Sequence, residues 1–523
     1  MKVLLEQIIT PITATDEDMF DIARARIKKT RALDLSGDMY VYKRSVDARH
    51  KDNIKLVNTV CAEVKALNGK KSFDFSKFGI KVLKNEQIEF KLSGEKPLNP
   101  PLVVGFGPCG MFCALGLARA GLKPIVIERG ADVDTRVKAV ESFYKTKVLN
   151  TQTNIQFGAG GAGTFSDGKL TTGINDPKCS YVLKTLCEFG APNDIMYQAK
   201  PHIGTDLLRG VIKNIASEIV RLGGEIHYST QLLSYDNGIA VTNNGSFAYS
   251  SLILAIGHSA RDTYAYLLSK GVAIEPKPFS VGVRVEHLQS EINEAMYGTG
   301  VGVERLGAAA YNVSYRQNER GVYSFCMCPG GQVVAAQSEE NTVVVNGMSH
   351  HARNGVNSNS AIAVQINRDD YGNTPEKAIE FQRSLEKKAF DLAGRNYKAP
   401  MQTLGDFYEG KASVEPKRIL PSYMDGYCEI CDLNKILPKV VSDYLKVGFE
   451  KFGKRIKGFD AKDVPITGVE TRTSAPVRIM RGDNYCMLTD KNVFPGGEGA
   501  GYAGGIMSAA VDGINIALAI LKK

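Results

Sequence analysis

The chain has 523 residues, of which 43% are hydrophobic and 23% charged, a composition that excludes intrinsic disorder and predicts two or three folded domains. Its 10 cysteines are too sparse for a disulfide-rich secreted scaffold, and no window has the apolar length of a signal peptide or a membrane span. Of the net charge of +9, residues 1–100 hold +5, so the rest is nearly balanced, and we expect a cytoplasmic protein without a membrane partner.

Residues 1–95 predict a small α+β domain. We expect a strand over 3–12, then a helix after Thr15 with an apolar face made of Phe20, Ala23 and Ile27. A second strand is expected over 39–46, a second helix over 54–67, and a β-rich tail to about residue 90.

A linker follows this domain. Residues 94–101 read GEKPLNPP, and two adjacent prolines with a glycine favour extended, unpaired chain. The segment 101–130 then predicts a strand, a glycine turn, a helix and a second strand. Residues 225–257 predict a run of strands joined by Asn/Asp-Gly turns and ending in a buried strand at 252–256. The last 30 residues return to strand, glycine loop and helix.

These elements predict an α/β protein with three units. We expect 1–95 as the N-terminal domain, 96–275 with 465–523 as a discontinuous Rossmann-type domain, and 276–464 as an α+β substrate domain inserted into it. Ligands of an open parallel sheet bind beyond the carboxyl ends of its strands. We therefore expect the site where the inserted domain meets this edge of the sheet.

The strongest motif is formed by Gly105, Gly107 and Gly110, spaced G-x-G-x-x-G between a strand at 102–104 and a helix at 111–120. The first glycine permits the tight turn, and the second lets the backbone approach a pyrophosphate at the positive N-terminus of the helix. The third lets the helix pack closely on the strand. Pro108 stands where the helix begins, where a missing N–H donor has no cost.

Glu128 ends the second strand of this unit, 18 residues after Gly110. This is near the expected offset of the acid that binds a ribose hydroxyl, and an acid there disfavours a 2′-phosphate. A glycine-rich turn alone is a weak signal. The flanking strands, the helix and the acid together predict dinucleotide binding.

The far end of the chain indicates which dinucleotide. Residues 492–520 place a strand before Gly496, a glycine-rich loop over 496–501 and a helix from about Tyr502. This order resembles the C-terminal FAD motif of glutathione-reductase-like flavoproteins. The resemblance implies that the chain returns to the first nucleotide fold, where a helix N-terminus faces the flavin and stabilises negative charge on it.

Over nearly all its length the chain resembles the NAD(FAD)-utilising dehydrogenase family, FAD-dependent proteins with a glutathione-reductase-like FAD-binding fold. Four further stretches carry the resemblance, namely 156–173, 277–287, 325–349 and 468–480. In such flavoproteins the first stretch runs beside the isoalloxazine, and a strand ending like 255–257 returns the sheet to the FAD face. The resemblance implies a cofactor and a redox class but no particular substrate. The expected cofactor-binding residues are Gly105, Gly107, Pro108, Gly110, Glu128, Arg129, Gly160, Gly161, Gly163, Thr164, Lys169, Gly257, Gly497, Glu498, Gly499, Ala500 and Gly501.

Candidates for chemistry are fewer. Cys326 and Cys328 precede a Pro-Gly-Gly turn that would expose a thiol near the flavin, but packing is the commoner role of a free cysteine, and both readings stay open. Arg284, Arg472 and Arg478 are candidate contacts to an anionic substrate or to the flavin, or ordinary ion pairs.

We expect no metal site. The pairs Cys326/Cys328 and Cys428/Cys431 differ in spacing and have no histidine nearby, whereas structural zinc needs four ligands. Nor does a Cys-x4-Cys pair follow the first nucleotide fold, which disfavours the flavin–disulfide relay of the disulfide reductases.

The sequence thus predicts an FAD-dependent oxidoreductase that transfers hydride through flavin N5 to or from a small-molecule substrate. The chain has no second strand–GxGxxG–helix unit, so NAD(P)H, where it is the donor, would bind transiently in the substrate cleft. The alternative is an FAD-containing RNA-modifying or RNA-binding protein that uses the basic N-terminal domain. Against it, the charge excess is modest and no RNA-reading aromatic motif occurs.

Overall fold

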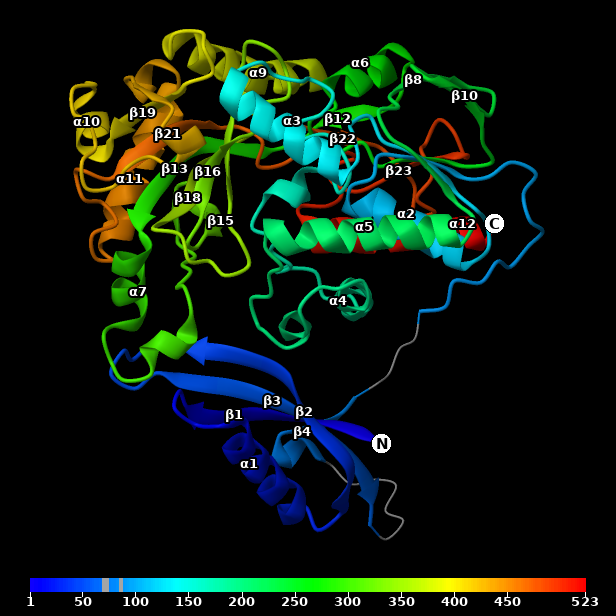
Figure 1. Ribbon diagram of the computed structural model, residues 1–523, viewed down its shortest axis with the longest axis vertical. Helices are drawn as coiled ribbons and strands as arrows, with labels where there is room; N and C mark the ends of the chain where they lie inside the picture. The colour runs from blue at the N-terminus through cyan, green and yellow to red at the C-terminus, as the bar shows by residue number, and fades with distance from the viewer. Residues whose placement is uncertain (68–74, 84–87) are drawn as a thin grey trace.

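The computed structural model describes residues 1–67, 75–83 and 88–523. Figure 1 shows a small N-terminal unit at one end of the molecule and two larger units beside each other at the other end. We call them the N-terminal unit, the cofactor unit and the inserted unit. The part of the predicted β-rich tail over 84–87 lies outside the described residues.

The N-terminal unit is an antiparallel sheet of order β2-β3-β1-β4, packed against α1 (Asp16–Lys29). Its strands are β1 (Lys2–Pro11), β2 (Leu33–Asp47), β3 (Lys55–Ala66) and β4 (Ile80–Val82). Helix α1 begins with a capping box between Thr15 and Asp18 and turns Met19, Ala23 and Ile27 into the core. Phe20, expected on that face, is only partly buried.

The predicted helix over 54–67 is wrong, because this segment is strand β3. Val60, Ala62 and Val64 point into the core under α1, while Glu63 and Lys65 are exposed. Strand β3 also pairs with β1 on one edge and β2 on the other, so its backbone groups are satisfied by the sheet. Tertiary pairing therefore overrides the helix propensity of its Ala, Glu and Lys residues.

The tail near residue 90 is not a strand either. Ile88, Phe90 and Leu92 leave the N-terminal unit and pack on the core of the cofactor unit. Phe90 lies so close to Gly116 that a Cβ there would come within 2.5 Å of its ring. The segment before the linker thus packs against α2 (Pro108–Arg119), the first helix of the cofactor unit.

The cofactor unit is built on a parallel sheet of order β23-β11-β5-β6-β7. The sheet combines four strands from residues 102–254 with one strand from residues 493–495. Its strands are β5 (Leu102–Val104), β6 (Ile125–Ile127), β7 (Glu225–His227), β11 (Leu252–Leu254) and β23 (Val493–Pro495). Its helices are α2 (Pro108–Arg119), α3 (Val133–Thr146), α4 (Lys178–Glu188), α5 (Thr205–Arg221), α6 (Arg261–Ser269) and α12 (Ile506–Leu521). A small antiparallel sheet completes it, with strands β8 (Leu232–Asp236), β9 (Ile239–Thr242) and β10 (Gly245–Ala248).

Helices α2 and α12 form the centre of this unit. Gly513 of α12 faces the backbone of Cys109, and Ala517 of α12 lies 3.2 Å from where a Cβ on Gly116 would stand. Small residues on both helices thus let the two backbones come close, and Figure 1 shows α2, α5 and α12 running together. No helix in the described part of the chain has the length and apolar character needed to cross a membrane.

The inserted unit is a mixed sheet of order β14-β15-β18-β13-β21-β19-β20 with helices packed around it. Its strands are β13 (Phe279–Leu288), β14 (Ser314–Gln317), β15 (Arg320–Cys328), β18 (Asn357–Ile366), β19 (Ala399–Thr403), β20 (Cys428–Ile430) and β21 (Pro465–Glu470). Its helices are α7 (Gln289–Tyr297), α8 (Arg368–Tyr371), α9 (Pro375–Leu392), α10 (Leu404–Glu409) and α11 (Lys439–Gly453). Two further strand pairs are β12 (Ile274–Pro276) with β22 (Val477–Ile479), and β16 (Gln332–Ala335) with β17 (Val345–Met348).

The boundary between these units differs from the prediction. Strand β21 lies between β13 and β19 in the inserted sheet, so residues 465–470 pair there and not with the cofactor sheet as expected. The chain passes from the cofactor unit to the inserted unit near β12 and returns near β22. These two strands pair antiparallel with each other.

Candidate cofactor and substrate site

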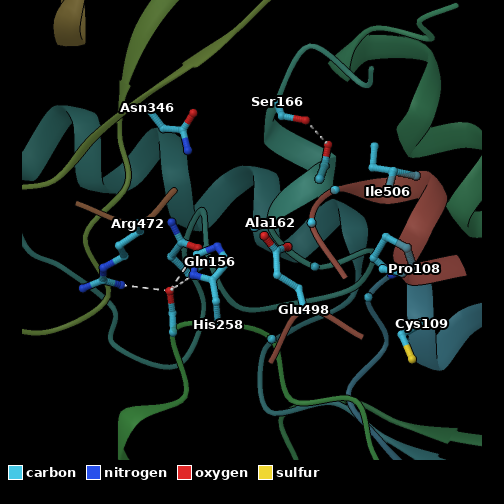
Figure 2. Close-up of a pocket in the computed structure, with 18 of the residues that line it drawn as sticks. Pro108, Cys109, Gln156, Ala162, Ser166, His258, Asn346, Arg472, Glu498 and Ile506 are labelled. Carbon is cyan, nitrogen blue, oxygen red and sulfur yellow. Dashed lines mark hydrogen bonds between the residues drawn. The ribbon is translucent and has the colours of Figure 1, made fainter. Parts of the chain in front are cut away.

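One cavity of about 550 Å³ lies between the cofactor unit and the inserted unit, a size typical of ligand sites. Both glycine-rich loops line it, and β15 of the inserted unit lines its far end. Figure 2 shows Glu498 at its centre, with Pro108, Cys109 and Ile506 on one side and Asn346 and Arg472 on the other. The predicted site residues that line it are Gly105, Gly107, Pro108, Glu128, Arg129, Gly161, Gly163, Lys169, Gly257, Glu498, Cys326 and Arg472.

The three glycines of the first loop differ in what an added Cβ would meet. Gly105 has φ +100°, and a Cβ on it would collide with the carbonyl oxygen of Ala255. A Cβ on Gly110 would collide with the carbonyl oxygen of Gly105. A Cβ on Gly107 would meet only Cα of Gly161, at 3.7 Å, and would otherwise project into open space at the cavity wall.

Glu128 joins three backbone segments at one end of the cavity. Its carboxylate accepts hydrogen bonds from the backbone N–H groups of Phe106 at 2.8 Å and of Gly130 and Gly158 at 2.9 Å each. A carboxylate has about four acceptor positions, so one remains for a ribose hydroxyl. Arg129 beside it forms an ion pair with Asp262 at 2.7 Å, so it closes this end of the cavity.

Arg136 organises the loop 154–161 from behind. Its guanidinium is fully buried and donates to the carbonyl oxygens of Asn154, Ile155, Gly158, Ala159 and Gly161, at 2.8 to 3.2 Å. Burial lowers the pKa of Arg136 to about 9, which leaves it charged at neutral pH. The sequence did not single out this residue.

The second glycine loop is held from below by Asp512. Its carboxylate accepts from the N–H of Gly497 at 2.7 Å and pairs with Arg481 at 2.6 Å. Glu498 alone of the predicted residues in this loop lines the cavity. Helix α12 begins at Ile506, four residues after the predicted start, and Gly504 and Gly505 before it line the cavity with no atom within 4 Å of an added Cβ.

Two titratable side chains at the centre are strongly perturbed. Burial raises the pKa of Glu498 to about 7, against the opposing charge of Lys277. Burial, followed by the charges of Arg472 and Arg261, lowers the pKa of His258 to about 3, so this imidazole is neutral at physiological pH. Both side chains line the cavity.

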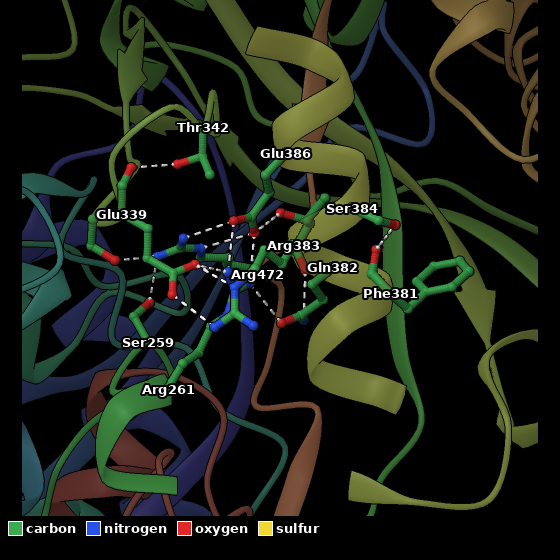
Figure 3. Close-up of polar contacts among 12 residues, drawn as sticks. Ser259, Arg261, Glu339, Thr342, Phe381, Gln382, Arg383, Ser384, Glu386 and Arg472 are labelled. Carbon is green, nitrogen blue, oxygen red and sulfur yellow. Dashed lines mark hydrogen bonds and ion pairs between the residues drawn. The ribbon is translucent and has the colours of Figure 1, made fainter. Parts of the chain in front are cut away.

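A buried ion cluster joins the two units (Figure 3), and its charges act on His258. Glu386 of α9 binds Arg261 of α6 at 2.8 Å and Arg472 at 2.9 Å. Arg472 also donates to the hydroxyl groups of Ser259 at 3.1 Å and Ser338 at 2.6 Å. Because its guanidinium is fully engaged, Arg472 presents a fixed positive charge at the cavity wall.

The other two arginine candidates do not line the cavity. Arg284 is fully buried, pairs with Glu470 at 2.8 Å and donates to the carbonyl oxygen of Cys326 at 2.9 Å. Arg478 is exposed beside Tyr502, with its ring centroid 5.2 Å away. A direct contact of either arginine with a ligand in this cavity is therefore not supported by its position.

The remaining predicted residues support the loops from outside the cavity. They are Gly110, Gly160, Thr164, Gly497, Gly499, Ala500 and Gly501, with Cys328 behind Cys326. Thr164, for example, is fully buried and donates to the carbonyl oxygen of Ala159 at 3.1 Å. In the described part of the chain no cluster of His, Cys, Asp and Glu could hold a metal ion.

Comparisons with known proteins identify the family. A sequence model described as FAD-dependent protein, C-terminal domain-like, matches residues 278–473. An uncharacterised protein of Clostridium beijerinckii is 48% identical over 498 residues, which cover 92% of each chain. The chain belongs to this family of FAD-dependent proteins.

Solved structures resemble it only distantly. Glycine oxidase from Geobacillus kaustophilus matches with a TM-score of 0.35 and 10% identity over 81% of this chain and 95% of that one. Aklavinone-11 hydroxylase, solved with FAD and aklavinone, matches with a TM-score of 0.34 and 14% identity over 82% and 63%. Scores this low say nothing about activity. The predicted FAD cofactor is confirmed by the family, whereas the glutathione-reductase-like subfamily stays a prediction.

The residues of this FAD-dependent protein fit the cofactor. Gly107, Gly257, Gly504 and Gly505 leave open space where a side chain would stand, which is the cradle that a bulky dinucleotide needs. The first turn of α2 offers N–H groups without acceptors in the helix, suited to a pyrophosphate. Glu128 would hold the ribose, and Glu498 and the start of α12 would contact the flavin half.

Several residues that line the cavity were not predicted from the sequence. Asp167 and Arg353 line the cavity beside Lys169, and His258 and Asn346 also reach it. Asp167 lies within the quoted stretch 156–173, so its place next to Lys169 was the available signal. Asn346 likewise lies within the stretch 325–349 and His258 directly follows 255–257, whereas Arg353 stands outside these stretches.

Proposed function

We propose that the protein is an FAD-dependent oxidoreductase whose small-molecule substrate binds at the far end of the cavity, against the inserted unit. The observation that supports this is the continuity of the cavity. The same space is lined by the pyrophosphate-type loop at Gly107, by Glu498 and by Phe325 and Cys326 of β15. A flavin held by the first two would have its reactive part next to the third.

FAD supplies two-electron chemistry at its N5 atom when bound. The chain's own residues bind and orient it. The N-terminus of α2 and Gly107 would receive the pyrophosphate, while Glu128 receives the ribose. The N-terminus of α12 places a positive dipole end at the cavity, where it would stabilise negative charge.

The polar side chains at the centre can hold or move a proton. Glu498, with a pKa of about 7, exchanges a proton near physiological pH and is suited to general acid–base work. His258 stays neutral, and its Nδ1 lies 3.0 Å from the hydroxyl of Ser259. Arg472 would stabilise an anionic group with its fixed charge.

NADH or NADPH is the proposed donor, bound transiently in this cavity, because the chain has no second nucleotide-binding motif. The test is anaerobic mixing of the FAD-loaded protein with each nucleotide while the visible flavin absorbance is followed. Rapid bleaching supports the proposal, and a preference for one nucleotide shows how the cavity treats a 2′-phosphate. No bleaching by either nucleotide contradicts the proposed donor.

RNA binding through the N-terminal unit is the second candidate, because Tyr40 and Tyr42 of β2 are 43% and 38% exposed. Exposed aromatic rings on a four-stranded sheet can stack on unpaired bases. Lys2 lies over Tyr40 at 5.9 Å and adds a positive charge beside it. A salt-dependent affinity for single-stranded RNA that falls in a Tyr40→Ala, Tyr42→Ala variant would support this candidate. An affinity unaffected by the double substitution would contradict it.

A further inference from the structure

Cys326 lies at the far end of the cavity, with Cys328 two residues further along strand β15. Strand β15 shifts register against β18 between Phe325 and Cys328, so the residues between them form a bulge. Cys326 has φ +47°, a left-handed conformation that non-glycine residues rarely adopt. The bulge turns Cys326 to the cavity wall and leaves Cys328 buried behind it.

The bulge is held in place by specific contacts. The carbonyl oxygen of Cys326 accepts from Nη1 of Arg284 at 2.9 Å and from the thiol of Cys328 at 3.2 Å. Arg284 is itself fixed by Glu470. A buried arginine and two polar partners thus support a backbone conformation that packing alone does not require.

We propose, building on the proposed function, that Cys326 and Cys328 are a redox-active pair that opens and closes a disulfide in the FAD cavity, and that the substrate is an anionic thiol or disulfide compound.

The cofactor unit contributes a cation to this pair. Nζ of Lys169 lies 3.9 Å from Sγ of Cys328, contacts the carbonyl oxygen of Met327 and stands 3.5 Å from the carboxylate of Asp167. An ammonium group beside a sulfur favours the thiolate, which is the reactive form. The two thiols and Lys169 come from different units and meet only in the folded protein.

The two cysteines are not equivalent. The pKa of Cys326 lies well below its ordinary value, first because of the neighbouring Cys328 side chain and then because of the charges of Lys169 and Arg284. The pKa of Cys328 is raised. Because Cys326 lines the cavity while Cys328 is buried behind it, Cys326 is the attacking thiol and Cys328 the resolving thiol. The charge of Cys326 also acts on Glu498, which links the pair to the flavin-binding loop.

Cys109 provides the contrast. It also lines the cavity, but burial and the charge of Asp512 raise its pKa well above the ordinary value. Proximity to the cavity alone therefore does not make a reactive thiol in this protein. Cys326 differs from Cys109 by the neighbouring Cys328 side chain and by the charges of Lys169 and Arg284.

The charge of the cavity wall indicates the substrate class. Near the pair, Lys169, Lys200 and Arg353 line the cavity. Among the described lining residues at this end, Asp167 is the carboxylate that opposes them, and it pairs with Arg353 and Lys169. The surplus is positive, so a disulfide that carries carboxylates is favoured over a cationic one.

The chemistry balances in the reducing direction. The Cys326 thiolate attacks one sulfur of the substrate, forms a mixed disulfide and releases the first thiolate. Cys328 then gives up its proton and attacks Cys326, which releases the second substrate thiol and closes the Cys326–Cys328 disulfide. Two electrons and two protons from reduced FAD reopen it, and the nucleotide donor restores the reduced flavin.

The decisive experiment counts electrons. The holoprotein is treated with diamide, freed of excess reagent and titrated anaerobically with dithionite. We expect uptake of about four electrons per FAD, two for the flavin and two for the disulfide. Cys326→Ser should take up about two, and Cys179→Ser, which removes a half-buried thiol on α4, should behave as wild type. Uptake of two electrons by the wild type overturns the proposal.

Mass spectrometry of the diamide-treated protein provides a readout that does not depend on the flavin. A loss of two hydrogens mapped to a peptide with Cys326 linked to Cys328 is expected, and its absence overturns the proposal. The electron uptake is measured with dithionite, which replaces the natural donor. It therefore stays the same even where NADH and NADPH fail to bleach the flavin. The two proposals thus fail in distinguishable ways.

The role of Lys169 and the substrate charge have their own readouts. In Cys328→Ser, the pH midpoint of Cys326 alkylation by iodoacetamide should rise when Lys169 is replaced by Met. The ratio of the rate constant with dithiodipropionate, an anionic disulfide, to that with cystamine, a cationic one, is measured for Cys326 and for a free thiol. This ratio should be about tenfold higher for Cys326. An unchanged midpoint contradicts the role of Lys169, and a preference for cystamine contradicts the substrate charge.

Discussion

Replacing Gly107 with alanine should separate cofactor binding from folding. The residue has φ −79°, which alanine adopts without strain, and the new Cβ would meet only Cα of Gly161 at 3.7 Å. We therefore expect the free energy of unfolding of the apoprotein to change by less than about 0.5 kcal/mol. The methyl group would occupy the space through which the pyrophosphate approaches the first turn of α2.

The expected loss of affinity follows from the contacts that this approach permits. A hydrogen bond to a charged group contributes about 1.5–3 kcal/mol. A displaced pyrophosphate would keep about two of these hydrogen bonds only in weakened form. A net loss of about 3 kcal/mol raises the Kd for FAD by about a hundredfold. Titration of the apoprotein with FAD, followed by quenching of flavin fluorescence, measures this directly.

Two further glycine variants serve as controls. In Gly110→Ala the Cβ would collide with the backbone of Gly105, so the apoprotein itself should lose about 1–3 kcal/mol. In Gly210→Ala, within α5, no atom lies within 4 Å, so stability should rise by about 0.5–1 kcal/mol with unchanged affinity. Wild-type affinity in Gly107→Ala would refute the assignment of the pyrophosphate site.

Three more outcomes are expected. A chain that ends at residue 491 lacks β23 and α12 and should not bind FAD, and wild-type affinity would contradict the discontinuous cofactor unit. Glu386→Gln leaves Arg472 buried without its carboxylate and leaves Arg261 with Glu339 alone, so urea unfolding should show a loss of about 3–5 kcal/mol, and a loss below about 1 kcal/mol would contradict this role. Because the pKa of Glu498 rises from 4.5 to about 7 on folding, the folded apoprotein keeps a proton that the unfolded chain releases within this window. Its stability should therefore fall as pH rises from about 4.5 to 7, by up to about 1.4 kcal/mol per pH unit, and a Glu498→Gln variant with the same slope would contradict the shift.

The glycine motifs were predictable because each requirement is local. Gly105 needs a positive φ and Gly110 must leave room for a carbonyl five residues away, and spacing alone expresses such demands. The start of α12 was less clear, because Gly504 and Gly505 extend the loop beyond Tyr502 without a distinct capping residue. Local rules thus located the loops better than their ends.

Long-range contacts explain what the sequence did not reveal. Arg136 is defined by carbonyl groups 18 to 25 residues away, and Glu386 by Arg261, 125 residues away. Neither partner can be identified without the fold. Strand β3 was misassigned for the same reason, because its two neighbouring strands decide its conformation. The bulge that turns Cys326 to the cavity likewise depends on β18.

The chain order of the cofactor sheet has a consequence during synthesis. The N-terminal unit is nearly contiguous in sequence and can form its core early. In the cofactor sheet, β5 cannot pair with β11 until β11 has been synthesised, and β11 cannot pair with β23 until β23 has been synthesised. Gly107 and Gly497 are 390 residues apart, a distance that a ribosome covers in roughly 20–80 s. Throughout that interval the apolar face of α2 has no α12 to cover it. Nascent chains should therefore depend on chaperones until α12 emerges, and FAD can be captured only after α12 has been synthesised.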